Sequence, residues 1–208
     1  MSPRRTRLDW GDSRKESNMK NTRTLTGVAV FTAIVVVLQL LCFFIRFGIF
    51  EITLVLVPIV VGAALYGPLA GGWLGLVFGL VVLLSGDAGL FFGWNPLGTI
   101  LTVLLKGTLA GVCAGLIYRA LAKWKSDIAA IAAGIAAPVV NTGIFFLGCL
   151  AFFLNDISVM AAENGQPDAI RFIIFGFIGG NFIFELLLSV VLSPVVVRLI
   201  KLGRKDKA

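Results

Sequence analysis

One lysine lies inside a stretch that is otherwise apolar enough to sit in a lipid bilayer. The stretch is ILTVLLKGTLAGVCAGL, from Ile100 to Leu116, and the charged residue is Lys106. A charged side chain at the centre of a membrane helix costs about 2.5–3.5 kcal/mol on insertion scales. Thr99 and Thr102 precede it at i, i+3, i+7 spacing, which puts the three side chains on one helix face. This pattern predicts that Lys106 has a partner, either a bound molecule or an acidic residue.

Two later apolar stretches carry polar residues at a comparable depth. VVNTG contains Asn141 and Thr142, and GGNFIFE places Asn181 and Glu185 one turn apart on one face. Three helices are therefore expected to present polar groups to one interior cavity. Two interpretations stay open. Lys106 and Glu185 form a buried ion pair that needs no ligand, or they belong to an outward-opening pocket for a small polar molecule, since ionisable residues in membranes usually mark pathways or sites.

The composition identifies the class of protein. Of the 208 residues, 58% are hydrophobic and 14% charged, and the mean hydropathy is +0.98. A soluble domain carries about 25% charged residues, so the chain is expected to be an integral membrane protein. Histidine is absent, and Cys42, Cys113 and Cys149 lie in apolar segments without motif spacing. A zinc site, a disulfide framework and a cysteine nucleophile are therefore not expected, and with no phosphate-binding or triad motif neither enzyme activity nor a cofactor is predicted.

Apolar stretches of suitable length give the elements that must position these residues. A helix needs about 20 residues to cross about 30 Å of hydrocarbon. The charge-free window Ile52–Gly86 is too long for one crossing, and Gly67-Pro68 divides it. We therefore predict an all-α membrane protein, a compact bundle of six transmembrane helices over Thr24–Phe44, Phe47–Tyr66, Leu69–Ser85, Pro96–Leu121, Ile128–Leu154 and Ala169–Ile200.

The basic residues predict the orientation. With both termini on one side, that side holds seven Lys/Arg of the N-terminal arm, three of RALAKWK and five from Arg198 onward, which is fifteen of the 18. The positive-inside rule then places both termini in the cytoplasm. We predict a disordered basic arm over 1–23, a membrane domain over 24–201 and a basic tail over 202–208. Met19 would make a natural start, and a solvated arm is favoured over nucleic-acid binding.

Glycine spacing predicts which helices pack closely. A four-residue glycine step occurs twice, at Gly71, Gly75 and Gly79 and again at Gly107, Gly111 and Gly115. Such faces let helix backbones approach each other closely, so the two helices are expected to pack through them.

The loop SGDAGLFFGWN lies between the third and fourth predicted spans. It holds Asp87, Phe91, Phe92, Trp94 and Asn95. Glycines permit hinge motion and aromatic rings exclude water, so the loop suits a gate over the pocket, with Asp87, Phe91 and Phe92 as its gating residues. An interfacial aromatic belt is an equal alternative.

The sequence resembles the substrate-binding S components of energy-coupling factor (ECF) vitamin transporters. The resemblance covers about residues 20–200 and rests on the order and spacing of six short spans. It includes TGVAVFTAIVVVLQ, where Ala29 and Ala33 form an AxxxA step, and the later stretches NPLGTILTVLLKGTLAGVCAGLIY and GGNFIFELLLSVVLSPVV.

The resemblance implies a multi-pass subunit of a prokaryotic plasma membrane that binds a vitamin from outside. It would dock through the Ala29 and Ala33 face onto a transmembrane coupling subunit, and two cytoplasmic ATPase subunits would drive release inside. The family holds its ligand on outer loops and the outer halves of helices four to six. The corresponding positions, with Thr102 on the same face, are Trp94, Asn95, Thr99, Thr102, Lys106, Asn141, Asn181 and Glu185.

The substrate is the least constrained expectation. Lys106 suits a carboxylate and the amides suit hydroxyl groups, which favours pantothenate, while the aromatic loop would favour riboflavin. Two other classes remain open, a self-sufficient small carrier or channel and a structural membrane protein without a ligand.

Overall fold

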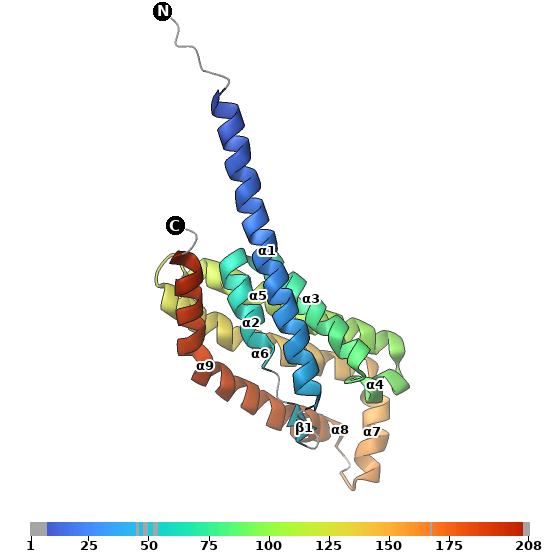
Figure 1. The fold of residues 1–208 in the computed structure, drawn as a ribbon. Helices are drawn as coiled ribbons and strands as arrows, with labels where there is room; N and C mark the ends of the chain where they lie inside the picture. The colour runs from blue at the N-terminus through green and yellow to red at the C-terminus, as the bar shows by residue number, and fades with distance from the viewer. Residues whose placement is uncertain (1–7, 45, 48–49, 52–53, 167, 206–208) are drawn as a thin grey trace, which may run out of the picture.

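Helices make up nearly all of the structure, a computed structural model that describes residues 8–44, 46–47, 50–51, 54–166 and 168–205 (Figure 1). The helices are α1 (Leu8–Phe44), α2 (Leu56–Tyr66), α3 (Pro68–Ser85), α4 (Gly89–Trp94), α5 (Pro96–Leu121), α6 (Ser126–Phe152), α7 (Leu154–Glu163), α8 (Ala169–Phe172), the π-helix η1 (Ile173–Ile178) and α9 (Gly179–Lys205). Two antiparallel two-residue strands, β1 (Arg46–Phe47) and β2 (Phe50–Glu51), join α1 to the rest.

The predicted all-α membrane bundle is confirmed. Five helical stretches in the described residues are long and apolar enough to cross a membrane, namely Thr22–Cys42, Pro68–Ser85, Pro96–Leu121, Ser126–Phe152 and Ala169–Gly203. Many large apolar side chains on them are exposed. Those side chains would face lipid, which is the arrangement that a membrane bundle requires.

The second predicted span, Phe47–Tyr66, is wrong in its first half. The helix α2 starts only at Leu56 and has eleven residues, about 16 Å at 1.5 Å per residue. Pro58 lies in its first turn, where a proline is tolerated because its missing N–H has no helical partner there. Residues 47 and 50–51 belong instead to the short strands. The absence of charges after Ile52 indicated membrane, but it did not indicate where the helix begins.

The helix that holds the first span extends beyond it toward the N-terminus, while the span itself, Thr22–Cys42, nearly matches the prediction. α1 begins at Leu8, so the described part of the N-terminal arm continues the span as helix, where disorder was expected. The segment 8–23 has no proline to stop the helix. The division into arm, membrane domain and tail, and the start at Met19, stay predictions.

The glycine faces of α3 and α5 pack against each other as expected. A Cβ atom at Gly71 would meet the backbone oxygen of Gly111, and one at Gly75 would meet that of Gly107. The reciprocal contacts also hold, since a Cβ at Gly107 or Gly111 would meet the backbone of α3. The helices are antiparallel, joined by α4, and their close approach fixes α5 in the middle of the bundle.

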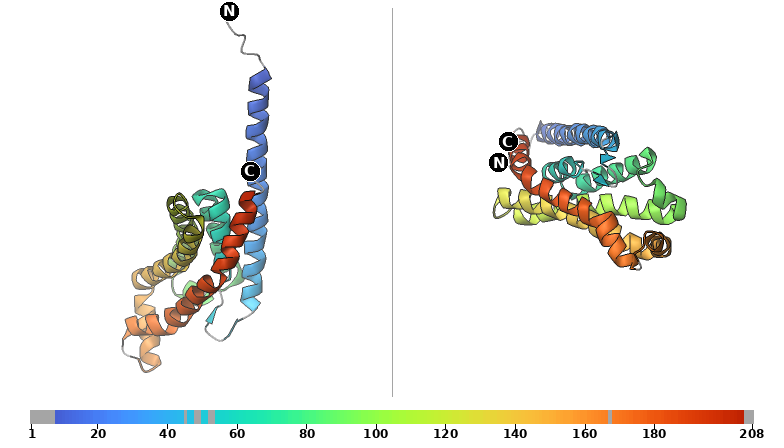
Figure 2. Two further views of the ribbon diagram at one scale, coloured as in Figure 1. Left: turned by 90° about the vertical axis from the view of Figure 1, so that its left-hand side faces the viewer. Right: turned by 90° about the horizontal axis from the view of Figure 1, so that it is seen from below.

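The last span differs from a single regular helix. α8, η1 and α9 follow one another without a loop, and η1 is a π-helical insertion near the outer end. Pro194 lies inside α9, where a proline removes one helical hydrogen bond and bends the helix. Figure 2 shows α9 running obliquely across the bundle and bending in its C-terminal half.

The charges separate as predicted. The C-terminal part of α9 and the turn between α5 and α6 lie at one end of the bundle (Figure 1). This basic end carries Arg119, Lys123, Lys125 and Lys201. α4 and α7 lie at the opposite end, called here the loop end. The arrangement agrees with the topology derived from the positive-inside rule, which assigns the basic end to the cytoplasm.

Candidate functional site

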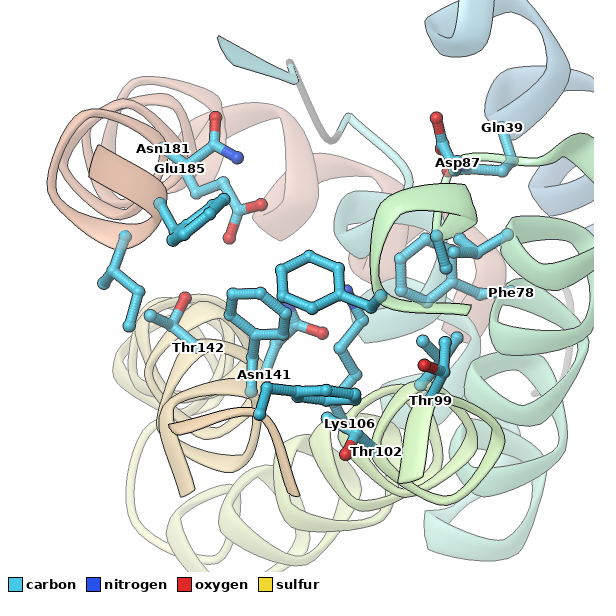
Figure 3. A pocket seen from close by; sticks show the side chains of 18 residues that line it. Gln39, Phe78, Asp87, Thr99, Thr102, Lys106, Asn141, Thr142, Asn181 and Glu185 are labelled. Carbon is cyan, nitrogen blue, oxygen red and sulfur yellow. The ribbon is translucent and has the colours of Figure 1, made fainter. Parts of the chain in front are cut away.

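A cavity of about 140 Å³ lies toward the loop end, under α4. Residues from α1, α3, α4, α5, α6, η1 and α9 line it, so nearly the whole bundle contributes. Figure 3 shows its side chains. The polar residues that line it are Gln39, Asp87, Thr99, Thr102, Lys106, Asn141, Thr142, Asn181 and Glu185. The aromatic residues are Phe78, Phe91, Phe145, Phe153 and Phe177.

The first turns of α5 are fixed by Asn95. Its Oδ1 accepts a hydrogen bond from the backbone N–H of Gly98 at 3.0 Å, as a helix N-cap does. Thr99 borders the cavity. Its hydroxyl group donates a hydrogen bond to the backbone oxygen of Asn95 at 2.8 Å, within the helix. Thr102 packs against Gly148 of α6, and its hydroxyl oxygen has no hydrogen-bond partner among the described residues.

Lys106 is half-buried between aromatic rings. Its Nζ lies 5.2 Å from the centroid of the Phe145 ring and 6.0 Å from that of Phe78. Ring faces attract a cation electrostatically, which offsets part of the desolvation of the ammonium group. The ion pair of Lys106 with Glu185, one of the two interpretations of the sequence, stays a prediction. The ammonium group carries three hydrogen-bond donors, which a ligand can use.

α6 contributes an amide to the same cavity. Asn141 is 6% exposed, and its Oδ1 accepts no hydrogen bond within the described residues. Leaving such a buried acceptor without a partner costs about 1–3 kcal/mol. Thr142 follows it, and Asn181 and Glu185 of α9 lie on the far side (Figure 3). A ligand that donates a hydrogen bond to Asn141 would remove this cost.

The loop between α3 and α5 closes the cavity. Its residues 89–94 form α4, whose Phe91 ring packs on rings from three other segments at centroid distances of 5.1–5.5 Å, those of Phe145, Phe153 and Phe177. Asp87, before α4, accepts a hydrogen bond from Gln39 Nε2 of α1 at 2.8 Å. The loop is thus held at two points, by a ring cluster and by α1.

Three of the residues expected to bind or gate do not line the cavity. Trp94 packs edge-to-face on Phe91 at 5.4 Å, Asn95 caps α5, and Phe92 is 44% exposed. The other members of the predicted set, Asp87, Phe91, Thr99, Thr102, Lys106, Asn141, Asn181 and Glu185, all border it.

The sequence interpretation missed Gln39 and the rings outside the loop. Gln39 is 4% exposed and lies in an otherwise apolar span. A polar residue in such a span indicates a functional site, so Gln39 was recognisable from the sequence. The rings of Phe78, Phe145, Phe153 and Phe177 carry no such signal, because phenylalanine is common wherever a helix faces lipid or a core.

The predicted docking residues do not line the cavity. Ala29 and Ala33 are both exposed on α1. They share this outer face of α1 with exposed apolar residues, including Val30 and Val37.

A family model described as ECF transporter, substrate-specific component, matches residues 23–197. The match includes every residue that lines the cavity. Comparisons with curated proteins and with solved structures gave no match.

Proposed function

The chain belongs to the family of ECF transporter substrate-specific components, and we propose that its cavity captures a small anionic micronutrient, with pantothenate as the best candidate. As a member of that family it is a multi-pass membrane transport subunit and not an enzyme. The substrate would enter at the loop end, which the charge distribution assigns to the outside.

The observation that carries the proposal is that Lys106 and Asn141 line the same cavity. The ammonium group can donate charge-assisted hydrogen bonds to a carboxylate. The Asn141 oxygen, buried without a partner in the described residues, can accept from a hydroxyl or an amide N–H. Pantothenate carries a carboxylate, an amide and two hydroxyl groups, so one molecule supplies both kinds of contact.

The size of the cavity supports the smaller of the two candidate vitamins. An apolar protein cavity of about 150 Å³ holds a molecule such as benzene, and this one measures about 140 Å³. A flexible chain molecule larger than benzene would fit once Phe91 moves outward, which agrees with the gating role proposed for its loop. The three fused rings of riboflavin would require the whole ring cluster to separate.

Gating and docking complete the proposal. The loop that holds Asp87 and Phe91 opens to admit the substrate and then closes over it. On the outer face of α1, Ala29 and Ala33 offer a small-residue surface on which a coupling subunit can pack closely. Two cytoplasmic ATPase subunits bound to that subunit would supply the energy.

The test is the identity of the ligand. The protein is purified in mild detergent, denatured, and its released small molecules are identified by mass spectrometry; binding of pantothenate and riboflavin is then measured by calorimetry. We expect retained pantothenate and tight binding of it alone. Retained riboflavin would contradict the substrate assignment. Uptake by liposomes that hold this chain without partners would instead indicate a self-sufficient carrier.

The docking face is tested separately. Replacing Ala29 and Ala33 by leucine should leave substrate binding unchanged and reduce uptake by the complete transporter more than tenfold, because bulky residues prevent close helix approach. Ala120→Leu with Ala151→Leu, two exposed alanines elsewhere, is the matched control. Normal uptake by the α1 variant, or uptake lost equally in both variants, contradicts the assignment.

A further inference from the structure

A second hollow lies at the opposite end of the protein from the substrate cavity. It measures about 450 Å³ and is formed where α2 turns into α3 beside the last two turns of α5. Ala63, Ala64 and Leu65 give it an apolar side, and Tyr118 is buried beneath it with its hydroxyl hydrogen-bonded to Ser126. We call this hollow the basic groove.

Two cations line the basic groove. Both are exposed, Arg119 in the last turn of α5 and Lys123 in the turn that follows it. The acidic residue in the first turn of α6, Asp127, is held by Lys201 at 2.8 Å. Among the residues that line the groove there is no carboxylate, so its electrostatic potential is positive and favours an anion.

The flanks of the basic groove are apolar and exposed. Leu69, next to the lining residue Pro68, is 90% exposed, and Trp124, next to Lys123, is 89% exposed. Leu116 on α5 is 52% exposed. Tryptophan is enriched at the level of lipid headgroups. Positive charge, an exposed tryptophan and apolar flanks therefore meet at the end of the apolar span Pro96–Leu121, where the headgroups of a bilayer are expected.

We propose that the basic groove binds the headgroup phosphate of an anionic phospholipid from the leaflet at the basic end. Arg119 and Lys123 contact the phosphate, and the acyl chains lie along Leu69 and Leu116. Basic pockets between membrane helices on the cytoplasmic side suit such headgroups. An acidic protein segment is a less suitable occupant than a lipid, because the exposed apolar side chains of Leu69 and Leu116 flank the groove. The proposal does not depend on which substrate the other cavity binds.

The test compares two double variants of equal charge change. Arg119→Gln with Lys123→Gln removes the groove cations, and Arg23→Gln with Lys125→Gln removes two other exposed cations outside the groove lining. Each protein is placed in mixed phosphatidylglycerol and phosphatidylcholine nanodiscs, and retained lipid is counted by native mass spectrometry. We expect the groove variant to lose the preference for phosphatidylglycerol about tenfold and the control variant to keep it.

Controls separate the alternatives. Both variants should keep the melting temperature of the parent chain, since their side chains are exposed. An equal loss of preference in the two variants means a diffuse surface charge effect and overturns the proposal. So does competition by millimolar inorganic phosphate, which would indicate a free anion. Normal lipid preference in the groove variant, with co-purification of the coupling subunit lost, would identify an acidic protein as the occupant instead.

Discussion

The two faces of α5 lie in the same bundle but have opposite surroundings, one packed tightly and one bordering a cavity. One face, with Gly107 and Gly111, lies against the backbone of α3 so closely that a methyl group has no room. The other, with Thr102 and Lys106, borders a cavity whose walls come from distant helices. The first face stabilises the bundle through contact alone, whereas the second leaves polar groups incompletely satisfied.

The difference between the two faces indicates that one face of α5 serves the stability of the fold and the other serves ligand binding. A backbone interface has no adjustable side chains, so any added atom must move a helix. A cavity with a cation and a buried amide oxygen is energetically costly when empty, and a ligand can recover that cost. Substitutions on the two faces of α5 should therefore separate into losses of folding and losses of binding.

The largest effect is expected at Gly75. Gly75→Ala places a methyl group against the Gly107 oxygen, and the helices must separate, at a cost of about 3 kcal/mol. Melting in detergent, followed by circular dichroism, measures it. Gly143→Ala is the control, because a Cβ there meets nothing within 4 Å and alanine is the better helix former by about 1 kcal/mol. Similar melting temperatures for the two variants would show that the glycine face is not tightly packed.

On the cavity face, Lys106→Met should weaken binding of the anionic substrate about 10- to 100-fold, the value of a hydrogen bond to a charged group. The melting temperature should not fall, because the substitution removes a half-buried charge. Calorimetry measures the affinity, with Lys125→Met at the basic end as the control. Unchanged affinity would remove Lys106 from the site.

Asn141→Leu should separate binding from folding most cleanly. It removes a buried oxygen that has no partner among the described residues, so the ligand-free protein should melt at the same or a higher temperature, while affinity drops about tenfold. Ser126→Ala is the opposite control. It breaks the 3.1 Å hydrogen bond with Tyr118 at the basic end and should lower stability slightly without changing affinity. A destabilised Asn141→Leu protein would mean that the amide has a structural role.

The smallest effect concerns the hydrogen bond between Gln39 and Asp87. Gln39→Leu removes this hydrogen bond between the loop and α1 and should speed substrate dissociation two- to fivefold, as stopped-flow measurements would detect. Trp73→Phe removes a different hydrogen bond of α1, the one to Thr32 at 3.2 Å, and should leave the dissociation rate unchanged. Equal rates in the two variants would show that the loop does not depend on this attachment.

Local patterns predicted α5 well. Its span, Pro96–Leu121, matches the structure because a proline suits the first helical position and the glycine and polar steps repeat along one regular helix. α2 was mispredicted because hydropathy registers the absence of charge, which strands and loops in the membrane share with helices.

The polar part of the candidate site was predictable from the sequence, and most of its aromatic part was not. Polar residues in apolar helices, such as Lys106, Asn141 and Glu185, are recognisable in the sequence because placing them in a membrane costs free energy. Phe91 was found because its loop was unusually aromatic, but Phe145 and Phe177 became part of the wall only through the crossing of α6, η1 and the loop. Asn95 caps α5 and Trp94 packs on Phe91. Neither lines the cavity, and their assignment to a ligand stays a prediction.

The π-helix η1 makes the last span tolerant of a change in its length by one residue. One residue more than an α-helical turn is accommodated there, and each residue of a helix corresponds to about 100° of rotation. In a regular helix, losing one residue would rotate the flanking segments relative to each other by that amount. Losing one residue from Ile173–Ile178 would instead turn that segment into ordinary α-helix and leave the flanking segments in place, because the π-helical turn already absorbs the extra residue. Related chains that lack this residue would therefore keep Asn181 and Glu185 on the cavity wall, and would differ only at the η1 residues that line it, Phe177 and Ile178.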